Sequence, residues 1–180
     1  MTDGAIVLVG PMGAGKTSVG RRVARALERP FTDTDKIVVR AHGPIPDLFV
    51  AHGEAHFRAL ERAAVVEALA GGGVVALGGG AVLDADTRAD LRAHRVVLLT
   101  VQPHVIASRI GGEARPLLAG EDPVERWNRI FTERRPVYEE VADVEFDTSA
   151  GPLAAVVAKI VTWAQAPSTA ASDATERTSR

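Results

Sequence analysis

Five residues near the start of the chain have the types and spacing of an anion site: Gly10, Gly13, Gly15, Lys16 and Thr17. They fit the pattern G-x-x-x-x-G-K-T, in which glycines let the backbone turn tightly and present its N–H groups to phosphate. The lysine of this pattern reaches the outer phosphates of a nucleoside triphosphate, and the threonine hydroxyl ligates Mg²⁺. The spacing therefore predicts a triphosphate-binding P-loop rather than an ordinary glycine-rich turn.

Two carboxylates, Asp33 and Asp35, flank Thr34 at the end of a short segment that we expect to be extended, residues 31–34. Side chains two positions apart on a strand project to the same side, and the carboxyl ends of parallel strands line the ligand crevice. We therefore predict that both carboxylates face Lys16. One can hold Mg²⁺ through water while the other orients or deprotonates an acceptor hydroxyl. The alternative is a turn in which Asp and Thr are simply favoured.

A glycine triplet, Gly78 to Gly80, directly follows the apolar run of residues 74–77. Glycines at the carboxyl edge of a sheet let a substrate approach the backbone closely and offer N–H donors. The alternative is a flexible turn, which is our interpretation of a second triplet at residues 71–73. Because Leu77 runs straight into glycine, no Walker-B-type aspartate ends this run, and this absence disfavours a switch GTPase.

Three arginines stand out by their context, although a solvated surface role is the default for any one of them. Arg58 follows Phe57 on a predicted helix, Arg115 lies in a Gly/Pro-rich loop, and Arg134 begins the run Arg-Arg-Pro-Val-Tyr. A guanidinium binds a carboxylate in a bidentate manner, and a loop arginine that closes over ATP stabilises charge on the transferred phosphoryl group. The tryptophans Trp127 and Trp163 are predicted to be packing residues.

The elements that must position these residues alternate between strand and helix along the chain. The predicted strands are 5–9, 31–34, 74–77, 96–101 and 144–146. The predicted helices are 16–28, 54–69, 84–94 with Asp84 as N-cap, one opening at Pro103, 123–140 with an interruption at Pro136, and 152–165. Alternation with apolar strands predicts an α/β fold, with a parallel sheet covered by helices on both faces.

The composition limits the classes of protein that are compatible with the chain. It has 180 residues, a formal net charge of −2 and no cysteine. We predict one domain over residues 1–165 and a disordered tail over 166–180, which lacks a hydrophobic period. The charge does not favour a nucleic-acid partner, and no apolar run approaches the roughly 20 residues that cross a bilayer. With no recognisable signal peptide, we expect a cytoplasmic protein.

Taken together, these residues resemble the shikimate kinase family over about residues 5–165. The matching motifs are the P-loop of residues 10–17, Asp33-Thr34-Asp35, Gly53-Glu54 leading to Phe57-Arg58, Gly78 to Gly80, Arg115-Pro116-Leu117-Leu118, and Arg134 with Pro136 and Tyr138. The P-loop alone marks only a superfamily, whereas the combination and order of the motifs are specific. The segment 41–45 departs from the family pattern, and Thr17 replaces the more common serine.

The resemblance implies a P-loop kinase fold with a five-stranded parallel sheet in the order 2-3-1-4-5. It also implies a substrate-binding region at about residues 33–62 and a lid at about residues 111–122. The implied reaction is transfer of the ATP γ-phosphate to the 3-hydroxyl of shikimate, on the route to chorismate and the aromatic amino acids, by an enzyme that we expect to be a monomer.

The resemblance also implies roles for individual residues. ATP is held by Gly13, Ala14, Gly15, Lys16, Thr17, Ser18, Arg109 and the lid residue Arg115. Shikimate is bound by Asp35, Arg58, Gly79, Gly80 and Arg134, with the two arginines on its carboxylate. One Mg²⁺ per active site is held by Thr17 and, through water, by Asp33. The expected catalytic residues are Lys16, Asp35, as candidate base, and Arg115.

Two alternatives remain at this stage. One is a related kinase acting on another polyol acid such as gluconate, which would not need this combination of Asp35, Gly79 and two carboxylate-binding arginines. The other is a nucleotide-binding regulatory module without turnover, against which the aspartate pair and the lid arginine argue. Shikimate-dependent release of ADP distinguishes both alternatives from the implied reaction.

Overall fold

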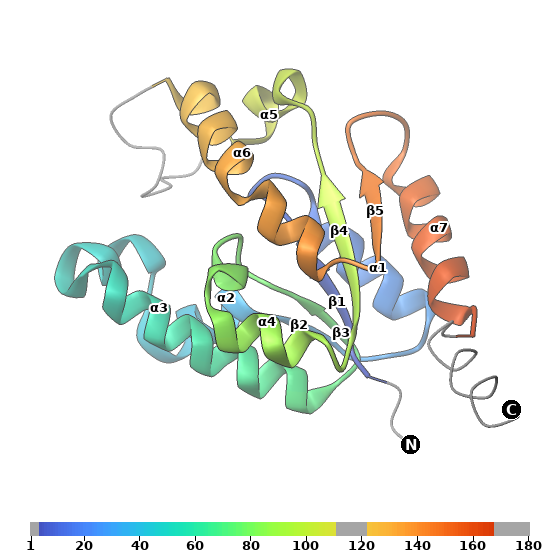
Figure 1. Cartoon of the computed structure of the whole chain (residues 1–180), viewed down its shortest axis with the longest axis horizontal. Coiled ribbons are helices and arrows are strands. Elements are labelled where there is room, and N and C mark those ends of the chain that lie inside the picture. Colours follow the sequence, from blue (N-terminus) through green and yellow to red (C-terminus); the bar gives the residue numbers. More distant parts are fainter. Residues whose placement is uncertain (1–3, 111–121, 168–180) are drawn as a thin grey trace, which may run out of the picture.

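The central element of the fold is a five-stranded parallel sheet in the order β2-β3-β1-β4-β5, which confirms the expected order. The computed structural model describes residues 4–110 and 122–167 (Figure 1). The strands are β1 (Ile6–Val9), β2 (Phe31–Asp33), β3 (Val74–Ala76), β4 (Arg95–Thr100) and β5 (Val144–Asp147). Every residue of β1 and β3 is buried, because both faces of the sheet are covered, as in other parallel sheets.

Helices cover both faces of this sheet and make the fold three-layered. They are α1 (Lys16–Ala26), α2 (Thr34–His42), α3 (Ile45–Gly71), α4 (Ala85–Leu91), α5 (Pro103–Ile110), α6 (Pro123–Val141) and α7 (Leu153–Gln165), with a 3₁₀ turn η1 (Ala81–Leu83). Figure 1 shows α4 and α6 in front of the sheet and α1 behind it, where α1 packs against α7. The carboxyl ends of the strands therefore lie at an edge of the sheet between these two layers of helices.

Side-chain caps fix where two of the helices begin. The Asp84 carboxylate accepts from the backbone N–H of Thr87 at 2.8 Å, which confirms the predicted N-cap. Asp122 caps α6 in the same way, with its Oδ1 atom 2.8 Å from the N–H of Val124. Such caps satisfy N–H groups that have no partner within the helix. Pro103 is the first residue of α5, also as predicted.

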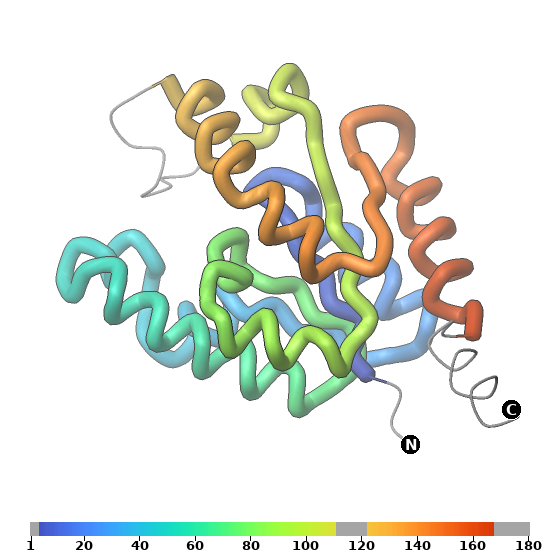
Figure 2. The backbone as a smooth tube through the Cα atoms, in the orientation of Figure 1, coloured from blue at the N-terminus to red at the C-terminus, as the bar shows by residue number. Residues whose placement is uncertain are grey.

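The region between β2 and β3 is more helical than the sequence indicated. Helix α2 was not predicted. Helix α3 begins at Ile45 instead of residue 54, and Pro46 does not prevent this, because proline is tolerated in the first turn of a helix. Gly53 interrupts α3 with a φ of 81°. Around this break, α2 and α3 enclose a small second core of Val38, Leu48, Phe57 and Ala64. The first part of α3 projects beyond the sheet, at the left of Figure 2.

Helix α6 runs without a break through Pro136, so the predicted interruption there is wrong. Buried side chains on both sides of the proline, among them Trp127 and Tyr138, hold the two halves of the helix against the main core. Of the predicted lid, residues 111–122, only Asp122 is described; of the predicted tail, only Ala166 and Pro167. In the described part of the chain no helix is both long and apolar enough to cross a membrane.

Candidate functional site

The P-loop connects β1 to α1 at the carboxyl edge of the sheet. Gly10, Gly13 and Gly15 have φ values of 138°, 79° and 91°, which only glycine adopts readily, so the predicted need for glycine here is confirmed. At Gly10 a side chain would also collide with β4, since its Cβ would lie 2.1 Å from the Leu99 carbonyl oxygen. The Lys16 ammonium donates to the carbonyl oxygens of Gly10, at 2.7 Å, and Pro11. The Lys16 ammonium group thus lies against the backbone of the P-loop.

Thr17 and Asp33 meet at the start of α1. The Thr17 hydroxyl donates to Asp33 Oδ2 at 2.7 Å, while Asp33 Oδ1 accepts from the backbone N–H of Lys36 and caps α2. No cluster of three or more carboxylate or histidine ligands occurs in the described part of the chain. A hydroxyl and one carboxylate fit Mg²⁺ all the same, because this ion is commonly held by one or two carboxylates together with water and substrate phosphates.

The structure corrects the reason given for pairing Asp33 with Asp35. Residue 35 lies in the first turn of α2 and not on an extended segment, so the two side chains are not related by strand alternation. Asp33 contacts the P-loop helix through Thr17, whereas Asp35 lies against Gly78, where an added Cβ would be 2.7 Å from Asp35 Oδ1. The two carboxylates therefore contact different parts of the site.

The glycine triplet makes room mainly for side chains of this chain, and this changes the interpretation drawn from the sequence. A Cβ at Gly78 would lie 2.6 Å from Glu61 Oε1, and one at Gly80 would lie 2.3 Å from Arg58 Nη1. The N–H of Gly78, expected to be a donor for a ligand, already donates to the Thr34 hydroxyl at 3.0 Å. Two of the three glycines thus allow charged side chains to approach the backbone closely.

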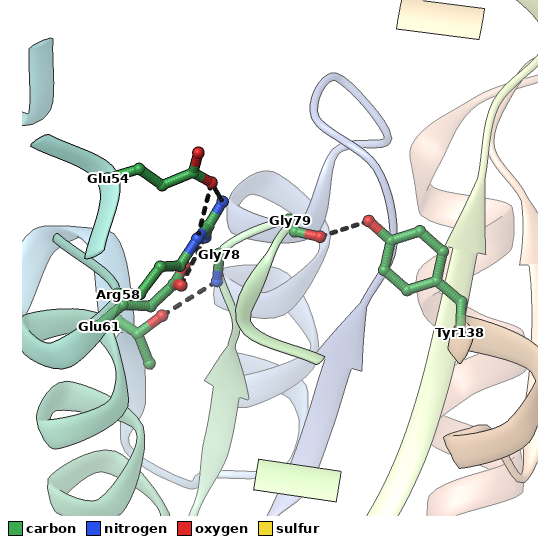
Figure 3. Close-up of polar contacts among 7 residues, drawn as sticks. Glu54, Arg58, Glu61, Gly78, Gly79 and Tyr138 are labelled. Atoms are coloured by element: carbon green, nitrogen blue, oxygen red, sulfur yellow. Dashed lines mark hydrogen bonds and ion pairs between the residues drawn. The ribbon is translucent and has the colours of Figure 1, made fainter. Parts of the chain in front are cut away.

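Gly79 differs from its two neighbours. Its carbonyl oxygen accepts from the Tyr138 hydroxyl (Figure 3). A Cβ placed on Gly79 would meet nothing closer than the backbone nitrogen of Met12, at 3.6 Å. This glycine therefore lies where the turn after β3 approaches the P-loop, and of the three it is the one with room beside it.

Arg58 is held by two glutamates of its own helix, as Figure 3 shows. Its Nη1 atom lies 2.6 Å from Glu61 Oε2, and its Nη2 atom lies 3.1 Å from Glu54 Oε1. Glu61 is only 3% exposed. Burial raises the pKa of Glu61, and the nearby Asp35 adds to this effect, while Arg58 and Arg134 oppose it. The arrangement orients the Arg58 guanidinium over Gly80.

Glu61 is the main site residue that sequence reasoning missed. The only sequence signal is its spacing, because Glu54, Arg58 and Glu61 stand at positions i, i+4 and i+7 and hence on one face of a helix. This spacing also occurs on ordinary solvated helix faces. Its burial beside Arg58 is what distinguishes Glu61.

The raised pKa of Glu61 predicts how stability changes with pH. The folded protein keeps the Glu61 proton at pH values where the unfolded chain, with an ordinary pKa near 4.5, has released it. Stability falls with rising pH wherever the folded state binds more protons. As pH rises above about 4.5, we therefore expect the free energy of unfolding of the wild type to fall relative to Glu61→Gln, by at most about 1.4 kcal/mol per pH unit.

Chemical denaturation of both proteins across this pH range measures the difference. Glu67→Gln, which changes an exposed glutamate of the same helix, is the matched control for the loss of one charge. The prediction is contradicted if the free energy of unfolding of the wild type, minus that of Glu61→Gln, stays constant or rises as the pH increases.

The adjacent arginines of α6 have different surroundings. The charge of Arg134 lowers the pKa of both Glu61 and Tyr138, so Arg134 lies on the side of the glycine triplet. Arg135 pairs instead with Glu139, at 2.6 Å, and with Glu145. Of the two adjacent arginines, Arg134 is therefore the one that lies near Glu61 and Tyr138. Burial raises the pKa of Tyr138 to about 12, so its hydroxyl stays a donor to Gly79 at neutral pH.

Arg109 contacts two loops. Its Nη1 atom donates to the carbonyl oxygen of Gly13 at 3.0 Å and to the Thr148 hydroxyl at 2.9 Å, and its Nη2 atom donates to the Thr148 carbonyl oxygen. Arg109, which the resemblance assigns to ATP binding, thus lies between the P-loop and the loop after β5. The predicted lid residue Arg115 lies outside the described residues.

Comparison with known proteins identifies relatives of this arrangement. The family model described as shikimate kinase matches residues 12–165. A shikimate kinase from Corynebacterium efficiens is 45% identical over 158 residues, which cover 87% of this chain and 94% of that protein. One from Streptomyces avermitilis is 51% identical over 145 residues, covering 79% of this chain and 84% of the relative.

A solved structure has the same fold. The shikimate kinase from Acinetobacter baumannii, in complex with shikimate, is 36% identical to this chain. It superposes with a TM-score of 0.85 and covers 91% of this chain and 93% of its own. The similarity thus extends over the sheet, the P-loop and the α2–α3 region together.

Proposed function

This chain belongs to the shikimate kinase family, and from this premise we propose which of its residues bind and phosphorylate the substrate. The family activity is an ATP-dependent phosphotransferase reaction with shikimate as the acceptor. The proposed products are ADP and shikimate 3-phosphate. The observation that carries the assignment is the convergence of Asp35, Arg58 and Arg134 on the glycine turn that lies next to the P-loop.

The acceptor carboxylate is bound by Arg58 and Arg134. A guanidinium matches a carboxylate with two parallel N–H donors, and such charged hydrogen bonds are stronger than neutral ones. Arg58 is oriented by Glu54 and Glu61, and Arg134 carries its charge toward the same place. Gly79 leaves room for the substrate ring beside these two arginines, and Gly80 contributes to the same site by letting the Arg58 guanidinium lie close to the turn.

Asp35 orients the acceptor hydroxyl and accepts its proton as the phosphoryl group is transferred. Since this transfer passes through a loose transition state, positioning and charge stabilisation account for most of the catalysis. By accepting the hydroxyl proton, the carboxylate also makes the attacking oxygen a better nucleophile toward phosphorus. Asp35 suits this role because it lies against Gly78, next to the proposed substrate pocket, while Asp33 accepts the hydrogen bond of Thr17.

The nucleotide side consists of the backbone of residues 13–18, Lys16 and Arg109, together with Arg115 of the lid. Thr17 and, through water, Asp33 hold one Mg²⁺, which neutralises charge on the β- and γ-phosphates when bound. The Lys16 ammonium, now on the carbonyl oxygens of Gly10 and Pro11, turns to the transferred phosphoryl group. We place this single domain, residues 1–165, in the cytoplasm, where it acts as a monomer.

An acceptor panel tests the proposed function. With ATP and Mg²⁺, we expect release of ADP to depend on shikimate and to give shikimate 3-phosphate, which ³¹P NMR and mass spectrometry identify. Gluconate and other hydroxy acids should give no more ADP than a reaction without acceptor. Turnover with gluconate alone would favour the related kinase, and nucleotide binding without turnover would favour a regulatory module.

A further inference from the structure

The outer side of the P-loop is held by three side chains from the second half of the chain. The carbonyl oxygens of residues 12–14 accept in turn from Trp127 Nε1 at 2.8 Å, Arg109 Nη1 at 3.0 Å and Thr148 Oγ1 at 2.8 Å. These donors come from α6, from α5 and from the loop after β5. Three consecutive carbonyl groups therefore have separate donors.

The orientation of a carbonyl group determines that of the next N–H group. In a trans peptide the C=O of one residue and the N–H of the next point in opposite directions, and no cis peptide occurs in the described residues. When Trp127 holds the carbonyl of Met12, the N–H of Gly13 is turned to the opposite side. Glycine has few conformational restraints of its own, so an external hydrogen bond matters more here than beside a bulkier residue.

Trp127 has the surroundings of a fixed donor. Its side chain is only 1% exposed, and its ring lies 5.2 Å from that of Phe131, measured between centroids. Burial and ring packing leave the indole little freedom, so its N–H group keeps its direction toward Met12. The sequence-based prediction of a packing residue is therefore correct but incomplete.

The same face of α6 also reaches the acceptor side. Trp127, Phe131, Arg134 and Tyr138 stand at positions i, i+4, i+7 and i+11, a spacing that places them on one side of the helix. Tyr138 donates to the carbonyl oxygen of Gly79, in the turn after β3. Eleven residues of helix extend about 16 Å, so one rigid element connects the nucleotide loop with the acceptor turn.

We propose that Trp127 and Tyr138 are positioning residues that hold the P-loop and the acceptor turn, respectively, from one face of α6. Neither touches a reacting atom; Trp127 acts through the peptide between Met12 and Gly13, and Tyr138 acts through Gly79 and through its hydrogen bond with Arg134. This inference rests on the proposed function, because it assigns each loop to one of the two substrates. It requires that the loss of either donor affects mainly the substrate on its own side.

Two conservative variants test whether each residue affects mainly one of the two substrates. Trp127→Phe and Tyr138→Phe each keep an aromatic ring and lose one hydrogen-bond donor. We expect Trp127→Phe to raise the KM for ATP and the Kd for ADP about tenfold, because the cost of an unpaired buried carbonyl group falls on the loop conformation that binds the nucleotide. Its KM for shikimate should stay within about twofold of the wild type. Tyr138→Phe should instead raise the KM for shikimate and leave the KM for ATP and the Kd for ADP nearly unchanged.

The matched control is Trp163→Phe, the same substitution at the other tryptophan, which lies on α7 beneath Arg95. It should leave both KM values unchanged. Thermal unfolding of all three variants shows whether each is folded at the assay temperature. If Trp127→Phe does not fold, a tryptophan analogue with sulfur in place of the indole N–H keeps the full ring and gives the same comparison.

The outcomes separate this inference from the proposed function. Titration with ADP in a calorimeter needs no acceptor, so it measures the effect of Trp127 even if shikimate were not the substrate. Parallel changes of both KM values in each variant, or no change relative to Trp163→Phe, would overturn the proposal. A weakened ADP affinity in Trp127→Phe, together with an unchanged KM for shikimate, supports it.

Discussion

Asp35→Asn is expected to lower kcat by about 10²- to 10⁴-fold, the usual range for the loss of a general base. The affinity for ATP should remain within about twofold of the wild type, because Asp35 lies against Gly78, whereas Asp33 is the carboxylate bonded to Thr17. An asparagine amide has nearly the same shape, so the change removes the negative charge and the proton acceptor while leaving the packing intact. Steady-state kinetics with ATP and shikimate, together with direct measurement of nucleotide binding, give the two values.

Asp47→Asn provides the control, since it neutralises an exposed aspartate in the first turn of α3. It should leave kcat unchanged. An unaltered kcat in Asp35→Asn would remove Asp35 from its proposed role. A large loss of ATP affinity would instead place this carboxylate on the nucleotide side, with Asp33.

Arg134→Ala is expected to raise the KM for shikimate by about 30-fold or more. Truncating one partner of a buried charged pair costs about 2–5 kcal/mol, and Arg134 carries its charge toward the turn where the substrate carboxylate is proposed to bind. Arg134→Lys should fall between the wild type and Arg134→Ala, because lysine keeps the charge and loses the planar fork. The KM for ATP should change little in both variants.

The neighbouring residue offers a close control. Arg135→Ala removes the same side chain one position along α6, where it pairs with Glu139 and Glu145 at a half-exposed position. Ion pairs of this kind contribute about 0–1 kcal/mol, so the KM for shikimate should not change measurably. Equal effects of the two substitutions would show that the local charge of α6, and not contact with the carboxylate, determines substrate affinity.

Much of the fold could be predicted because it depends on local patterns. The apolar strands, the N-cap at Asp84 and the proline that opens α5 all act within a few residues. Helix α2 was missed, since it is only 9 residues long and packs mainly through the small core that it shares with α3. Pro136 was interpreted as a break because its effect on the backbone is local, whereas the packing that holds α6 together is not.

The same contrast between local patterns and long-range packing applies to the candidate site. The P-loop depends on φ values that nearly require glycine, so its sequence pattern and its geometry are tightly linked. Arg58 was predicted from its motif, but its partner Glu61 could be recognised only from burial. The close approach of charged side chains to Gly78 and Gly80 was not predicted, because these side chains come from α2 and α3.

By itself the sequence determined which residues are the candidates for the chemistry: the phosphate loop, the two aspartates and the arginines, whose types and spacing follow from phosphate and carboxylate chemistry. Only the tertiary structure decided which neighbours each of them contacts, and our proposed division between the two substrates rests on these contacts. It placed Asp33 with Thr17 and Asp35 with Gly78, turned Arg134 toward the site and Arg135 away from it, and connected Trp127 to the P-loop. The physical reason is that a loop conformation depends on a few neighbouring dihedral angles, while the direction of a side chain depends on packing between elements far apart in the chain.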